Sequence, residues 1–263
     1  MDVNQLQQLA ESLLTRLDYA WTFLLLSTRF MVFFLLIPGV GGGFMGIALR
    51  YPAILLMALV SVNPAALAAV PSNAAIMVAQ MACEVCLGAA IALIPLMVIS
   101  GAQVAGHLAS GTMGLNGAQL FDPTSQAPLS DLSRFYSDIA VLIFLLIGGH
   151  YVAIAELAGL GGRIAPGSFI LSDIGLNTLI DQSARIFQVG CLIAAPVIVA
   201  LLLTNFVMGI ISKAIPTLNI FVVSFPLTIG VGFAISILAL PEVALLLQRE
   251  MLGIPDVIRA LLS

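Results

Sequence analysis

The sequence contains several apolar runs that are each long enough to cross a lipid bilayer. A membrane-spanning helix needs about 20 consecutive, mainly apolar residues. Runs of about this length cover residues 20–37, 51–70, 74–100, 138–157, 184–212 and 215–240. Hydrophobic residues make up 61% of the chain and charged residues 8%, and a water-soluble fold cannot hide so much apolar surface. The sequence therefore predicts an all-α integral membrane protein.

Prolines and glycines divide these runs and predict bends in the helices. Pro95, Pro196 and Pro226 each fall inside an apolar run. Proline removes a backbone donor and clashes with the preceding turn, so a helix that contains it is expected to kink. The sequence shows no obvious internal repeat, and we expect one polytopic domain over residues 1–263.

Three segments of this domain are more polar than the rest. Residues 1–19 carry leucines at helical spacing among polar side chains, which predicts an amphipathic helix lying on the membrane or on a neighbour. In residues 101–137, glycine, serine, asparagine, glutamine and proline replace the aliphatic residues, and we expect a long loop of functional importance there. Residues 241–263 form a more polar C-terminal tail.

Charge and cysteine content exclude several classes of function. The net charge is −4, and the nine lysines and arginines are scattered, so the chain offers no basic surface for nucleic acid. Cys83 and Cys86 have a redox-type spacing, but they lie inside an apolar helical pattern, as does Cys191. We interpret them as buried thiols that act as small hydrophobic side chains. No metal, cofactor or disulfide is expected.

Four polar residues stand in or near the apolar runs: Arg29, Glu84, His150 and Glu156. A charge at the centre of a bilayer costs about 2.5–3.5 kcal/mol, so each needs a partner, a polar lumen or water. They form either ion pairs between helices or a proton or ion relay in a secondary transporter. Because opposite charges are scarce, Arg29 is expected to pair with Glu84 or Glu156. No nucleophile stands with a base, so catalysis is not expected.

One stretch combines many glycines with deformable apolar side chains. Four glycines fall within residues 106–117. Glycine gives the backbone freedom, while methionine and leucine give adaptable apolar bulk. The segment is therefore expected either to plug a pore or to form an exposed connector. The residues of the predicted plug are Gly106, His107, Gly111, Met113, Gly114, Leu115, Asn116 and Gly117.

Two further stretches carry motifs in a specific order. The glycine-rich segment is followed by Phe121-Asp122-Pro123 and later by Gly148-Gly149-His150, and residues 213–221 read KAIPTLNIF and lead to Ser224-Phe225-Pro226-Leu227. In this order and spacing the motifs resemble the family of flagellar biosynthetic protein FliR and its injectisome counterparts. The motif residues to which we attach this resemblance are Asp122, Pro123, Pro216, Asn219, Phe221 and Pro226.

The resemblance implies a fold, partners and a place of action. A member of that family is expected to be a single R-type subunit that assembles with several P-type and Q-type subunits, and with other export proteins, into a helical type III export gate. Its long kinked helices are expected to form bent hairpins in the bacterial inner membrane, within the flagellar basal body. Unfolded flagellar proteins would pass through, and the subunit would not be an enzyme. The alternative is a proton- or ion-coupled secondary transporter.

Overall fold

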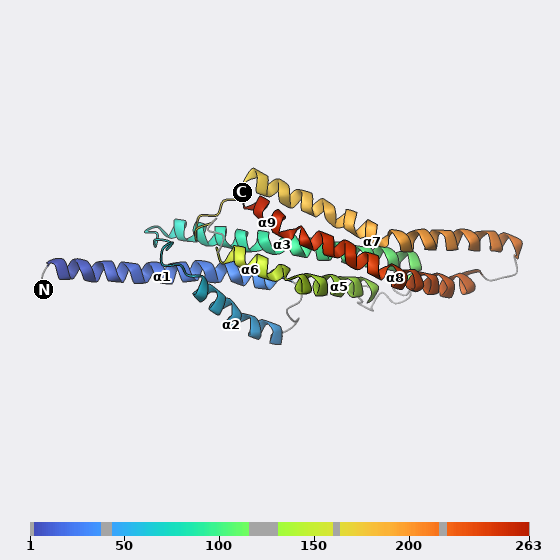
Figure 1. Ribbon diagram of the computed structural model, residues 1–263, viewed down its shortest axis with the longest axis horizontal. Helices are drawn as coiled ribbons and strands as arrows, with labels where there is room; N and C mark the ends of the chain where they lie inside the picture. The colour runs from blue at the N-terminus through green and yellow to red at the C-terminus, as the bar shows by residue number, and fades with distance from the viewer. Residues whose placement is uncertain (1–2, 38–43, 116–130, 160–163, 216–219, 263) are drawn as a thin grey trace. The chain divides into compact units, whose positions relative to one another are not determined.

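The structure is a computed structural model that describes residues 3–37, 44–115, 131–159, 164–215 and 220–262. Every regular element within these ranges is a helix (Figure 1). The helices are α1 (Val3–Leu36), α2 (Phe44–Ser61), α3 (Ala74–Met113), α5 (Asp131–Ile147), α6 (Gly149–Leu157), α7 (Asp173–Ala214), α8 (Ile220–Leu252) and α9 (Ile254–Leu261).

The described residues contain four helical segments that are long and apolar enough to cross a membrane. They are Leu14–Leu36, Ala74–Met113, Asp173–Ala214 and Val223–Leu261. The pair α5 and α6 counts as a fifth span if the two helices are taken together, and Gly148 breaks this pair with a φ of 79°. The prediction of an all-α integral membrane protein is confirmed.

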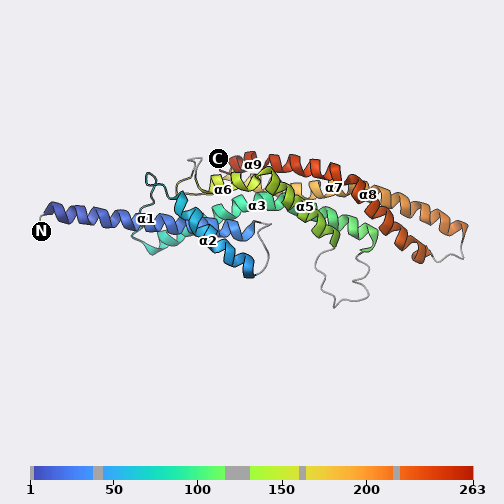
Figure 2. The ribbon, with the colours of Figure 1, turned by 60° about the horizontal axis from the view of Figure 1, so that its bottom comes forward.

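The chain forms two compact units. The first unit contains residues Met1–Leu96, Gly148–Ile180 and Ile254–Ser263. Within it, α2 lies beside α1, and α9 lies beside α6 (Figure 2). Its core includes Leu25, Phe30 and Phe33 of α1, all buried.

The second unit contains residues Met97–Ile147 and Asp181–Gly253. It holds the C-terminal part of α3, most of α7, and all of α5 and α8, and α5 packs along α8. Tyr136 and Phe144 of α5 and Leu247 of α8 are buried in its core.

The three prolines that we expect to kink helices lie inside helices and do not end them. Pro95 falls within α3, Pro196 within α7 and Pro226 within α8, which also contains Pro241. In a soluble helix an interior proline costs about 3 kcal/mol. In a membrane protein, neighbouring helices and side-chain hydroxyls can satisfy the freed backbone groups, so α7 runs over 42 residues.

The three polar segments are more helical than their composition indicates. Residues 1–19, where we expect an amphipathic helix, are helical from Val3 onward, and the helix continues without a break into the first apolar run. The C-terminal tail, residues 241–263, is helical in its described part, because α8 passes through Pro241 to Leu252 and α9 follows. Ile254, Ile258 and Leu261 of α9 are buried at helical spacing.

The prediction of a loop over the whole of residues 101–137 is wrong at both ends. α3 continues to Met113, and α5 already begins at Asp131. Ala102, Ala105 and Ala109 are fully buried, so one face of this part of α3 packs in the second unit, and packing overrides the low helix propensity of glycine. A Cβ at Gly106 would lie 2.3 Å from Ser133 Cα. Gly106 therefore permits a close helix crossing and does not act as a flexible joint.

The crossing of α3 and α5 predicts different effects for two glycine substitutions. Gly106→Ala forces the α3 and α5 backbones apart and should lower stability by about 1–3 kcal/mol, as overpacking does. Gly230→Ala in α8 is the matched control, because a Cβ there meets nothing within 4 Å. The check is the melting temperature of each variant purified in mild detergent. Equal melting temperatures for the two variants would contradict the described crossing.

Candidate functional site

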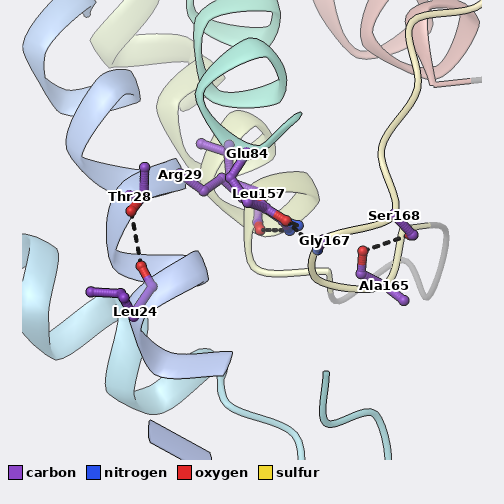
Figure 3. A network of polar contacts seen from close by, with 8 residues as sticks. All are labelled: Leu24, Thr28, Arg29, Glu84, Leu157, Ala165, Gly167 and Ser168. Atoms are coloured by element: carbon purple, nitrogen blue, oxygen red, sulfur yellow. Dashed lines mark hydrogen bonds and ion pairs between the residues drawn. The ribbon is translucent and has the colours of Figure 1, made fainter. Parts of the chain in front are cut away.

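A buried ion pair joins α1 and α3 in the first unit (Figure 3). Arg29 Nε donates to Glu84 Oε2 at 2.5 Å, and Arg29 Nη2 donates to Glu84 Oε1 at 3.0 Å. The two side chains are 1% and 0% exposed. This two-bond geometry is the strongest arrangement available to an arginine and a carboxylate. Of the two partners that the sequence left open for Arg29, the structure selects Glu84.

Both charged groups also bind backbone groups from elsewhere in the first unit. Arg29 Nη1 donates to the carbonyl oxygen of Leu157 at 2.8 Å, and Glu84 Oε1 accepts the N–H of Gly167 at 2.5 Å (Figure 3). Leu157 is the last residue of α6, where carbonyl groups lack intrahelical donors and attract a cation. The pair therefore ties together α1, α3, the end of α6 and the segment that holds Gly167.

Glycine residues bring these segments close enough for the pair to form. A Cβ at Gly88 of α3 would lie 2.5 Å from the carbonyl oxygen of Arg29, so only glycine fits where α1 crosses α3. Gly167 has a φ of 79°, which favours glycine, and a Cβ there would lie 3.1 Å from Gln80 Cδ. Gln80 is itself held, because Trp21 Nε1 donates to its Oε1 at 3.0 Å.

The other two polar residues that the sequence places in or near the apolar runs, His150 and Glu156, lie on α6. The His150 ring lies beside the Tyr151 ring, with 4.0 Å between ring centroids. Glu156 is half-buried, and its backbone carbonyl accepts the N–H of Gly159 at 3.1 Å. Because Glu84 is bound by both Arg29 and Gly167, the geometry supports an ion pair between helices at Glu84 and not a proton-relay position.

The described residues of the predicted plug belong to the second unit. Gly106, His107, Gly111 and Met113 lie on α3. Gly114 follows the helix with a φ of 82°, and its N–H donates to the carbonyl of Gly111 at 3.2 Å. This is the left-handed end that glycine commonly gives a helix.

Met113 is packed inside the second unit. It is 1% exposed, and a Cβ at Gly232 of α8 would lie 2.6 Å from Met113 Cε. The hydroxyl of Thr228 donates to the Met113 carbonyl at 3.3 Å. Leu115 is half-buried, while Asn116 and Gly117 lie outside the described residues. Met113 thus has a packing role in its own chain.

The remaining predicted residues are only partly described. Four of the motif residues lie outside the described residues: Asp122, Pro123, Pro216 and Asn219. The other two lie on α8, where Phe221 belongs to the first turn and Pro226 is exposed.

The interpretation of the cysteines as buried thiols is wrong for Cys86 and Cys191, which are exposed, while Cys83 is half-exposed. Both α3 and α7 present apolar surface outward, so an apolar neighbourhood in the sequence does not ensure burial within the chain.

Comparison with known proteins decides the family. A model of the family "Bacterial export proteins, family 1" matches residues 20–254, which is most of the chain and extends from the middle of α1 to the first residue of α9. The chain belongs to this family.

Named relatives of the export family agree with this assignment. The chain is 29% identical over 161 residues to flagellar biosynthetic protein FliR of Escherichia coli, a match that covers 61% of this chain and 62% of that protein. It is 33% identical over 166 residues to the protein of that name from Pectobacterium carotovorum, covering 60% of each. It is 26% identical over 228 residues to the one from Caulobacter vibrioides, covering 82% and 88%. The first two matches thus span about three fifths of each relative.

Sequence reasoning missed the backbone half of the ion-pair site. Leu157 contributes only its carbonyl oxygen and Gly167 only its N–H, so no side-chain pattern marks either position. The glycine and proline of Pro166-Gly167 were a signal for a turn, but they do not reveal that the turn amide points at a carboxylate.

The backbone partners predict an asymmetric response to substitution at the ion pair. Arg29→Met or Glu84→Met alone leaves a buried charge unpaired and should cost about 3–5 kcal/mol. The double Met variant removes both charges and should recover part of this loss, because the Leu157 carbonyl and the Gly167 N–H still lose their side-chain partners. Charge reversal, Arg29→Glu with Glu84→Arg, should not recover it. A glutamate at 29 would face the Leu157 carbonyl, and an arginine at 84 would face the Gly167 N–H. The check is the amount and melting temperature of each variant, and full recovery by the reversed pair would contradict the geometry.

Proposed function

We propose that this chain is a subunit of the flagellar type III protein export gate in the bacterial inner membrane. It helps to form and close the channel through which unfolded flagellar proteins leave the cell. The observation that carries the proposal is the family match over residues 20–254, together with relatives named flagellar biosynthetic protein FliR. The chain acts as a structural part of a channel and performs no catalysis, and energy for export comes from other components.

The proposed partners are P-type and Q-type export subunits and other membrane proteins of the flagellar export apparatus. Large apolar side chains are exposed along the helices, among them Leu146 at 77%, Phe187 at 67% and Leu238 at 73%. Lipid covers part of such a surface in any membrane protein. We assign the rest of this exposed apolar surface to packing on other subunits.

Closure of the channel is assigned to the end of α3 and the segment that follows it. Of the predicted plug residues, Gly106 and Met113 are engaged in packing within the chain. This leaves Gly111, which is exposed, Gly114 and the sequence beyond as the better candidates for contact with a passing substrate. We keep the plug as a proposal for these positions, supported by their glycine content and by the resemblance in this stretch.

A proton-coupled transporter fits the site less well. Such a protein needs a carboxylate that can release and rebind a proton or ion during each cycle. Glu84 is fully buried and is bound by Arg29 and by the Gly167 amide. Releasing this carboxylate would break two charge-assisted bonds to arginine and leave a buried guanidinium unpaired.

Purification of the tagged chain from its native membrane tests the export-gate proposal. The expected result is one large particle in mild detergent that contains this chain together with P-type and Q-type export subunits, identified by mass spectrometry. Double Met replacement at Arg29 and Glu84 should preserve more of the particle than either single replacement does. A homogeneous particle that contains only this chain would contradict the proposal and favour the alternative of a secondary transporter.

Glycine substitutions separate the plug from the packing of α3. Gly111→Leu should lower secretion of flagellar proteins while the export particle still assembles, because Gly111 is exposed on α3. Gly106→Leu should prevent assembly because it disrupts the α3–α5 crossing. Secretion is measured in culture medium and assembly by particle recovery. Unchanged secretion by Gly111→Leu would contradict the proposed plug.

A further inference from the structure

α7, drawn in yellow to orange in Figure 1, carries two parallel rows of residues in the second unit. The first, the inner row, packs within the unit: Ala194, Val197, Leu201 and Met208 are 1%, 0%, 0% and 6% exposed. The second, the outer row, begins one residue later and faces outward. It consists of Ala195, Ile198, Leu202, Asn205, Gly209 and Ser212.

The outer row has the spacing of a helix-packing surface. Its members recur at alternating intervals of three and four residues, which is the repeat that keeps one face of a helix against a partner helix. Ala195, Leu202, Asn205 and Gly209 are exposed, and Ile198 and Ser212 are half-buried. The row combines small residues with two large apolar residues, Ile198 and Leu202, as contacts between membrane helices do.

Asn205 is a costly residue to leave in lipid. It lies within residues 186–212, which contain no charged side chain. This stretch belongs to α7, which is long and apolar enough to cross a membrane. Among the described residues, none exchanges a hydrogen bond with its exposed carboxamide. Hydrocarbon offers no donor or acceptor, so this amide requires a polar group that the described residues of the second unit do not supply.

Gly209 lies one helical turn beyond Asn205, and none of the described residues packs closely enough against it to require a glycine. A Cβ built there meets nothing within 4 Å, whereas one at Gly190 of the same helix would lie 2.8 Å from Val104 Cγ1. Glycine inside a helix is less favourable than alanine, so a glycine with open space needs another explanation. Close approach of a second backbone supplies it, because glycine is enriched where membrane helices cross tightly.

We propose that the outer row of α7 binds a membrane-spanning helix of another subunit. That helix presents a small residue opposite Gly209 and a hydrogen-bonding side chain opposite Asn205, and it crosses α7 at the shallow angle of about 20° typical of this spacing. The inference rests on the proposed function, in which different subunits surround this chain. Lipid does not fit, because it cannot satisfy the carboxamide of Asn205.

Site-specific photo-cross-linking of the full chain in bacterial membranes tests the outer row. A photoreactive residue replaces Leu202, which belongs to the row, or Leu203, which does not. The two positions are matched, since both are leucines on α7 and are 61% and 63% exposed. The expected result is a protein adduct from position 202, identified by mass spectrometry as an export subunit, and a much weaker one from position 203.

Substitution of Asn205 tests the hydrogen bond itself. Asn205→Leu should lower the adduct yield from position 202 about threefold, the loss expected for an average hydrogen bond between membrane helices. Asn205→Gln keeps a carboxamide and should retain more of the adduct. A yield from position 202 that is unchanged in Asn205→Leu would overturn the assigned role of Asn205.

The outcomes separate this inference from the proposed function. An adduct from position 202 with a membrane protein outside the export apparatus would support the outer row and contradict the export-gate proposal. Three outcomes would overturn the proposal that the outer row binds a helix of another subunit. They are equal protein adducts from positions 202 and 203, adducts with lipid alone at position 202, and an adduct with a second copy of this chain. In those cases copurification with P-type and Q-type subunits still decides the export-gate proposal.

Discussion

The first unit depends on one buried ion pair, between Arg29 of α1 and Glu84 of α3. Moving two charges out of water costs several kcal/mol for each ion, and their mutual attraction offsets this only when the geometry is good and the remaining polar atoms are satisfied. Here two bonds join the side chains, while Leu157 and Gly167 bind them through backbone groups. The pair consequently fixes the positions of segments that are distant in the sequence.

Glycine makes both units possible by allowing backbones to approach. Gly88 lets α1 meet α3 beside Arg29, and Gly106 lets α3 meet α5 beside Ser133. A methyl group at either position would collide with a backbone atom. In a membrane the apolar effect between helices is weak, so close van der Waals contact and hydrogen bonds decide packing. This explains why the glycine-rich part of α3 is helical and packed.

The sequence predicted the features that depend on hydropathy and charge, and it missed those that depend on backbone contacts. The apolar runs gave the long helices, and the scarcity of acidic residues limited the partners of Arg29 to two. Glycine content was interpreted as flexibility at Gly106, because no sequence pattern distinguishes a joint from a close crossing. Leu157 and Gly167 could not be predicted as partners, since each contributes only a main-chain atom.

Hydrogen–deuterium exchange at the Gly167 amide tests the central claim most directly. If Glu84 accepts this N–H in a buried site, the amide should exchange slowly in the intact chain. Its protection should be lost in Glu84→Met and largely lost in Arg29→Met, which leaves the carboxylate free to move. Two results would contradict the claim that the Arg29–Glu84 ion pair holds the first unit together. One is fast exchange at Gly167 in the intact chain, and the other is equal exchange in the intact chain and in Glu84→Met.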